Sequence, residues 1–166
     1  MNARNYREVK GQAYTRKKYI RGSPASKIVK FTMGNPSGTY KYQVQLIGEK
    51  AVQIRHNALE SARVACNRIL SEKVGPNNYH LKILPFPHII LRENKMIFGA
   101  HADRLQDGMR NAFGKAISLA ARVKPGQKLI IADVNEEGLQ FATTALKRGG
   151  AKLPTPCRVV VKKLEA

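Results

Sequence analysis

The segment GMRNAFGKA, residues 108–116, carries the glycines and the lysine of a phosphate-binding loop. In enzymes that hydrolyse nucleotides, this loop has four residues between the two glycines, and a Ser or Thr that binds magnesium follows the lysine. Here five residues separate Gly108 from Gly114, and Ala116 stands where the hydroxyl would be. The spacing therefore argues against nucleotide hydrolysis.

The remaining reactive side chains do not form a catalytic or metal pattern. The four histidines lack close ligand spacing and have no neighbouring cysteine: His56, His80, His88 and His101. His101 and Asp103 have the residue types of an acid–base pair, but no nucleophile or cluster of carboxylates accompanies them. Cys66 and Cys157 lack CxxC spacing, so we expect reduced thiols packed in the interior. We expect no enzyme, no metal and no cofactor.

The charge of the chain points instead to a polyanionic partner. Its 166 residues include 30 Lys and Arg against 11 Asp and Glu, which gives a net charge of +19. Such an excess destabilises the compact state by self-repulsion, so it is typical of proteins that bind nucleic acid or anionic membranes. No apolar run is long enough to span a bilayer, and the start MNARNYREVK lacks the apolar core of a signal peptide. Nucleic acid is therefore the expected partner, and a membrane or a small-molecule substrate is not.

Residues 1–27 have the composition of a basic RNA-binding tail. Large aliphatic side chains are scarce, so the segment cannot pack a core of its own. Cations contact phosphates and tyrosine rings stack on unpaired bases, which makes this mixture suitable for RNA. A solubilising arm is the alternative, but it would not need the tyrosines. The residues predicted to bind RNA are Arg4, Arg7, Tyr14, Arg16, Lys17, Lys18, Tyr19, Arg21 and Lys27.

A second basic segment, at about residues 99–116, fits neither a helical nor a strand period. Its glycines allow bending and its cations suit phosphates, so we expect a long mobile loop that contacts RNA. A solvated loop without function is the alternative, and the length of the segment argues against it. The loop residues expected at the interface are His101, Arg104, Arg110 and Lys115.

The elements that hold the tail and the loop read as one α+β domain over residues 28–166. Amphipathic helices are predicted at 57–75 and 136–150, capped by Asn57 and Asn135, with Glu60 completing a capping box in the first. The alternation of apolar residues predicts strands at 28–33, 42–47, 79–84, 88–92, 117–123, 129–134 and 158–163. We expect a mixed or antiparallel sheet covered by the two helices.

Two stretches resemble a known family. ADRLQDGMRNAFGK, 102–115, is similar to the loop of the archaeal and eukaryotic ribosomal protein L-ten-e, within the universal L-sixteen family, and YTRKKYIRGSPASKIVKF, 14–31, is similar to its N-terminal segment. The order of elements matches along almost the whole chain, and the length resembles the archaeal form.

The resemblance implies a structural constituent of the cytoplasmic large ribosomal subunit. It would bind large-subunit rRNA near the central protuberance and the tRNA corridor, beside neighbouring ribosomal proteins. The basic loop would point toward the peptidyl-transferase region and lie near tRNA acceptor ends. The alternative is a non-ribosomal RNA-binding factor, such as an RNA chaperone, which the charge alone fits equally well.

Overall fold

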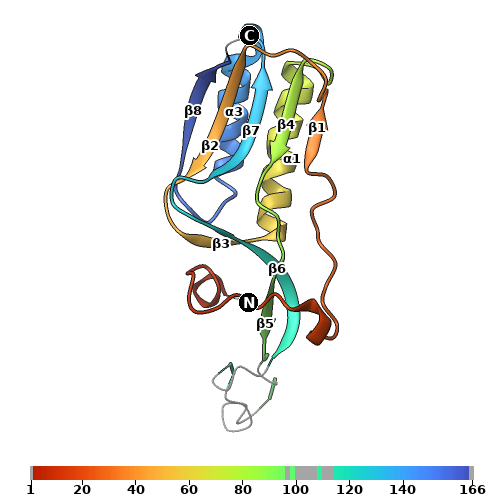
Figure 1. Ribbon diagram of the computed structural model, residues 1–166, viewed down its shortest axis with the longest axis vertical. Helices are drawn as coiled ribbons and strands as arrows, with labels where there is room; N and C mark the ends of the chain where they lie inside the picture. The colour runs from red at the N-terminus through yellow and green to blue at the C-terminus, as the bar shows by residue number, and fades with distance from the viewer. Residues whose placement is uncertain (1, 96–97, 100–107, 110–113, 165–166) are drawn as a thin grey trace.

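The computed structural model describes residues 2–95, 98–99, 108–109 and 114–164. Alternating apolar residues build a five-stranded sheet in the order β1-β4-β7-β2-β8. Its strands are β1 (Thr32–Gly34), β4 (Tyr79–Ile83), β7 (Lys128–Val134), β2 (Tyr42–Gly48) and β8 (Cys157–Lys163). A three-stranded sheet, in the order β3-β6-β5, extends from its lower end (Figure 1). It consists of β3 (Val52–Arg55), β6 (Lys115–Val123) and β5 (Ile89–Glu93).

Two helices, α1 (His56–Lys73) and α3 (Leu139–Gly150), cover one face of the five-stranded sheet (Figure 1). The core lies between them and the sheet, where Val44, Leu46 and Ile130 of the strands meet Leu59 and Leu70 of α1. No helix among the described residues is both long and apolar enough to cross a bilayer. The predicted α+β domain with two covering helices is therefore confirmed.

The described strands form two sheets, whereas a single sheet was predicted. All strand pairs in the described part of the chain are antiparallel, as expected. The strand β3 was not predicted, because VQIR is short and runs directly into α1. The predicted strand at 28–33 shrinks to β1, since Ile28 is buried in the core and Phe31 stacks on Phe86 at 5.4 Å between ring centroids.

The predicted capping box at the start of α1 was wrong. The helix begins at His56, so Asn57 lies inside it and its Oδ1 accepts only the neighbouring Ala58 N–H at 3.1 Å. Glu60 instead accepts two bonds from Arg63, at 2.6 and 2.9 Å, and one from the Val29 N–H at 3.4 Å. The Arg63 guanidinium lowers the pKa of the Glu60 carboxyl. Glu60 therefore ties the incoming chain to the helix rather than capping its end.

The second helix also begins differently. Residues Glu136–Gly138 form a 3-10 turn, and the Asn135 side chain makes no capping hydrogen bond. The helix α3 starts at Leu139, three residues later than predicted, and ends at Gly150 as predicted. Gly149 is needed there because a Cβ at this position would collide with the Cys66 Sγ on α1. The glycine lets the two helices approach closely.

We predict that Gly149→Ala destabilises the fold by about 1–3 kcal/mol, because the added methyl group overpacks the contact between α1 and α3. Chemical denaturation measures the change. Gly150→Ala is the matched control, since a Cβ there meets Leu46 at 3.4 Å, an ordinary contact. Combining Gly149→Ala with Cys66→Ala should restore much of the lost stability. An unchanged unfolding midpoint for Gly149→Ala alone would contradict the steric role of this glycine.

Candidate nucleic-acid interface

The basic tail lies along the three-stranded sheet, held first by Gln53 of β3. The Gln53 backbone N–H donates to the Arg7 carbonyl at 2.8 Å. Its side-chain Nε2 donates to the carbonyls of Tyr6 at 2.8 Å and Glu8 at 3.2 Å. Gln53 is only 7% exposed, and its buried amide finds its hydrogen-bond partners in the backbone of the tail.

Arg122 of β6 makes the second attachment. Its Nη1 donates to the Gly11 carbonyl at 3.0 Å and its Nη2 to the Lys10 carbonyl at 3.3 Å. Its Nε donates to the Gln53 Oε1 at 3.3 Å, so the two attachments share one network. The fork of guanidinium donors suits neighbouring carbonyls, which a lysine could not hold in the same way.

Two tail tyrosines lie against arginines of the sheet. The Arg92 guanidinium lies 4.0 Å from the centre of the Tyr14 ring, and that of Arg55 lies 5.5 Å from the centre of the Tyr6 ring. The Ile90 N–H of β5 donates to the Tyr14 carbonyl at 2.9 Å. Cation–π contacts of this kind stabilise by about 0.5–2 kcal/mol. Tyr14, predicted to stack on RNA, thus has a contact within the protein.

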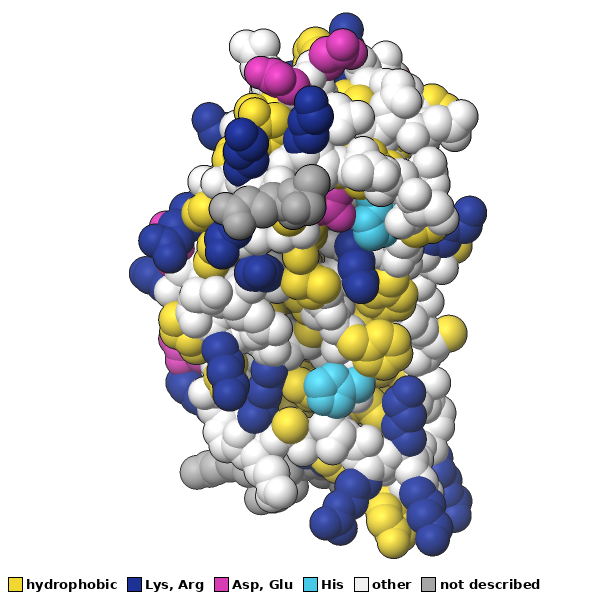
Figure 2. All heavy atoms as spheres, turned by 45° about the horizontal axis from the view of Figure 1, so that its top comes forward, with side chains coloured by type: hydrophobic (Ala, Val, Ile, Leu, Met, Phe, Trp, Pro, Cys, Tyr) yellow, Lys and Arg dark blue, Asp and Glu magenta, His cyan; other side chains and the backbone are white. Residues whose placement is uncertain are grey.

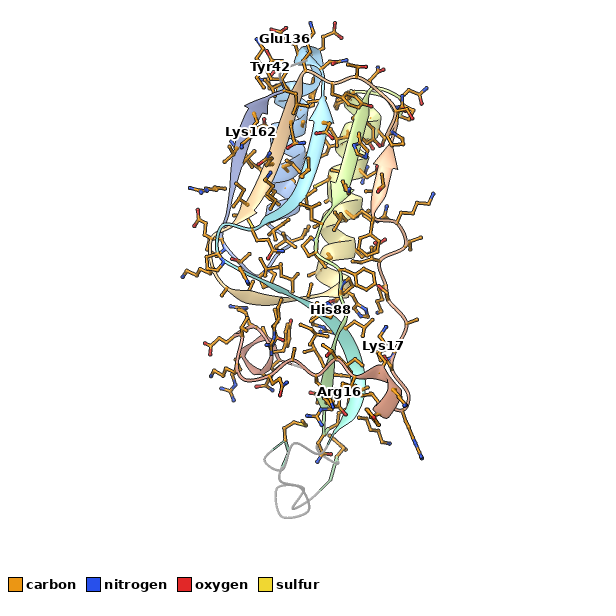
Figure 3. All side chains as sticks on the ribbon, in the orientation of Figure 1. Arg16, Lys17, Tyr42, His88, Glu136 and Lys162 are labelled. Carbon is orange, nitrogen blue, oxygen red and sulfur yellow. The ribbon has the colours of Figure 1, made fainter. Side chains whose placement is uncertain are left out.

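The other tail residues predicted to bind RNA are all exposed: Arg4, Arg7, Arg16, Lys17, Lys18, Tyr19, Arg21 and Lys27. Arg16 and Lys17 lie beside β6 at the lower end of the molecule, whereas Glu136 lies at the opposite end (Figure 3). Within the described residues, the one ion pair of the tail joins Glu8 to Lys10 at 2.9 Å. Lys and Arg side chains are spread over the face in Figure 2, and acidic side chains are fewer there. The tail therefore presents cations that carboxylates do not neutralise.

The central loop can be placed only at its ends. Lys115 is the first residue of β6 and pairs with Glu93 of β5, so this strand begins two residues earlier than predicted. His101, Arg104 and Arg110 lie outside the described residues. The antiparallel pair β5–β6 nonetheless fixes both ends of the segment, at the end of the molecule away from the helices (Figure 1).

Three residues of this interface were not predicted from the sequence: Arg55, Arg92 and Arg122. Arg92 and Arg122 sit in strands that were predicted, and a cation in a strand of a basic protein was indistinguishable from surface charge. Arg55 ends the strand that was not predicted, and its Nε donates to the Ser118 hydroxyl at 3.1 Å.

The other candidate chemical groups have structural roles. The His80 Nδ1 lies 3.0 Å from the Asp133 Oδ2, and the Gln43 Nε2 donates to the Asp133 Oδ1 at 2.9 Å. No group of metal ligands occurs among the described residues. Both cysteines are free thiols, and burial raises the pKa of Cys66 to about 12. Cys66 is therefore protonated and unreactive at neutral pH.

His56 connects the end of the tail to the core. It is 3% exposed at the start of α1, and its Nδ1 accepts the Lys27 N–H at 3.3 Å. Burial lowers the pKa of His56, and the nearby charges of Lys27 and Arg55 lower it further. The histidine is thus held neutral, which is the form that can accept this bond.

Comparison with known proteins gives a consistent result. Residues 9–160 match the family model described as Ribosomal protein L16p/L10e, the family that the loop and tail motifs resemble. Three similar proteins are each named "Large ribosomal subunit protein uL16". That of Staphylothermus marinus is 54% identical over 98% of this chain and 94% of its own length. The protein of Methanococcus maripaludis is 50% identical over 97% of this chain and 93% of its own length. The protein of Hyperthermus butylicus is 52% identical over 93% of this chain and 86% of its own length.

We predict that Arg122→Gln loosens the tail while leaving the core folded, because it removes the donors to Lys10 and Gly11. Trypsin should then cleave after Lys10 faster than in the unaltered protein, with little change in Tm. Lys124→Gln, at an exposed cation beyond the same strand, is the control with the same charge change. Equal cleavage rates in the two variants would show that Arg122 does not hold the tail.

We predict that stability falls as the pH drops below 6.5, the ordinary pKa of histidine. The pKa of folded His56 is lowered, so the unfolded chain takes up the proton first and acid favours unfolding. His56→Asn keeps an acceptor for the Lys27 N–H without a titrating group, and should flatten Tm between about pH 7.5 and 5. His88→Asn, at an exposed histidine, should keep the slope. Parallel Tm curves for His56→Asn and the unaltered protein would refute this assignment.

Proposed function

Because this chain belongs to the Ribosomal protein L16p/L10e family, we propose that it is a structural constituent of the large ribosomal subunit that binds large-subunit rRNA. The observation that carries the proposal is the family match over residues 9–160, which includes most of the tail and nearly all of the folded part. The relatives are named as ribosomal proteins rather than enzymes, so the expectation of a non-enzymatic role is confirmed by them.

The tail is the main rRNA contact in this proposal. Residues 1–27 act as the RNA-binding segment and 28–166 as the domain that holds it; Ile28 is the first buried residue of the described chain. The exposed cations of the tail release counterions when they meet phosphates, which supplies affinity without reading sequence. The three-stranded sheet holds the backbone of the tail in place. The other faces of the protein are available to neighbouring ribosomal proteins.

The central loop performs the more specific task. We place the protein near the central protuberance and the tRNA corridor, with the loop directed toward the peptidyl-transferase region and tRNA acceptor ends. The motif ADRLQDGMRNAFGK supports this, as does the strand pair β5–β6 that fixes both ends of the segment. Arg104 and Arg110 are the main phosphate contacts, since a guanidinium binds phosphate in bidentate fashion. His101 and Lys115 complete the set.

The test uses ribosomes that carry the chain with Arg104→Gln and Arg110→Gln. Both the unaltered protein and the variant should sediment with the large subunit through a wash in moderate salt, because the tail is intact. Particles carrying the variant should synthesise peptide several-fold more slowly, because two contacts to tRNA or the adjoining rRNA are lost.

The control replaces Arg68 and Arg148, two exposed arginines of α1 and α3, with Gln. It removes the same charge at the helices and should leave peptide synthesis unchanged. If the unaltered protein fails to sediment with the large subunit, a ribosomal place is wrong and a free RNA-binding factor is favoured. If the loop variant retains full synthesis, the role of the loop is wrong.

A further inference from the structure

A pocket of about 360 Å³ lies between the tail and the lower end of the three-stranded sheet. Its walls come from tail residues 14 and 19–22, from Arg92 of β5, and from residues 114–116 at the start of β6. We propose that this pocket binds one unpaired RNA nucleotide, with the base against the Tyr19 ring and the phosphate against Arg21 and Lys115. The inference rests on the proposed rRNA-binding function and assigns it a defined subsite.

The tail wall of the pocket is fixed by backbone contacts. The Tyr14 carbonyl accepts the Ile90 N–H at 2.9 Å, which ties this part of the tail to β5. A 3-10 turn at Lys17–Tyr19 follows, closed by the Tyr19 N–H to the Arg16 carbonyl at 3.0 Å. Gly22, with φ of +68°, then turns the chain away. The pocket is thus formed before any ligand arrives.

Tyr19 is the open aromatic surface of the pocket. Its residue is 71% exposed, whereas Tyr14 is half-buried beneath Arg92. The ring exposes apolar surface to solvent, and a nucleobase that stacks on it would bury that surface. The Lys18 Nζ lies over the same ring, 5.8 Å from its centre, and adds positive charge there. A base that stacks on Tyr19 would therefore carry its phosphate among cations.

The charges around the pocket favour an anion. Arg21, Arg92 and Lys115 line it, and none of the described lining residues is acidic. Glu93 does not line the pocket, although it pairs with Lys115 across β5 and β6. A pocket that combines this charge with a ring suits the phosphate and base of one nucleotide. Its volume lies near the lower end of about 300–1,000 Å³ typical of small-ligand sites, so a base pair would not fit.

The test measures binding of the full chain to an end-labelled short oligouridylate and to an RNA hairpin duplex of equal length. Tyr19→Ala should weaken binding of the single strand about fivefold or more, because one stacked base is lost. Binding of the duplex should be unaffected. Tyr19→Phe keeps the ring and should bind both RNAs as the unaltered protein does. Arg21→Gln should reduce the salt slope of single-strand binding by about 0.7, and Arg148→Gln on α3 should not.

The outcomes separate the pocket from the wider function. Equal losses for single strand and duplex in Tyr19→Ala, or no loss at all, would overturn the nucleotide pocket even if the unaltered protein still binds rRNA. Failure of the unaltered protein to bind either RNA or transcribed large-subunit rRNA would overturn the proposed function itself. Uridine monophosphate is the last arm. If it competes as tightly as the oligonucleotide, the pocket serves a free nucleotide and its assignment to RNA is wrong.

Discussion

Repulsion among like charges constrains the whole molecule, because a net charge of +19 is held on one small domain. The described ion pairs relieve little of it. The half-buried pair Glu60–Arg63 fixes α1, while Arg68–Glu72 and Glu8–Lys10 are largely exposed and contribute little. The tail is instead attached through uncharged partners: Arg122 donates to carbonyls and an amide, and Arg55 contacts a hydroxyl and a ring. Neutral acceptors fix a guanidinium without cancelling its charge. The attachment therefore orders the tail and preserves its positive surface.

The two sheets divide the work of folding and binding. The five-stranded sheet and its helices bury most of the apolar side chains, and Gly149 lets α3 lie directly against α1. The three-stranded sheet extends away from that core and offers its strands as a platform for the tail (Figure 1). Arg55, Arg92 and Arg122 come from three different strands of this platform. Cations that would repel one another in a single cluster are thus spaced by the sheet, and each meets a different part of the tail.

Periodicity was sufficient to predict the elements that bury one face. The strands near Val44 and Ile130 and the helix containing Leu59 alternate as their burial requires, and the structure has them nearly as predicted. The predicted capping box has the right spacing, but the helix begins at His56, before Asn57. The Glu60 carboxylate is bound instead by Arg63 within the same helix and by the Val29 N–H of the incoming chain. The attachment of the tail could not be predicted, since its acceptors are backbone carbonyls, which every sequence carries. Side-chain type predicts an RNA-binding tail, which stays a prediction, and it gave no indication of the strands that the tail lies against.

An attached tail changes the energetics of binding. Fixing the backbone of a disordered segment costs about 1–2 kcal/mol per residue, and that term would oppose RNA binding. Contacts at Arg7, Lys10, Gly11 and Tyr14 meet part of this cost within the protein. In the proposed complex with rRNA, each exposed side chain that becomes immobilised would still lose about 0.5–1.5 kcal/mol. Arg16, Lys17, Lys18 and Arg21 therefore keep the freedom to adjust to phosphates, while the backbone beneath is already in place. Such a surface combines a fixed position with adaptable contacts, as an irregular folded RNA demands.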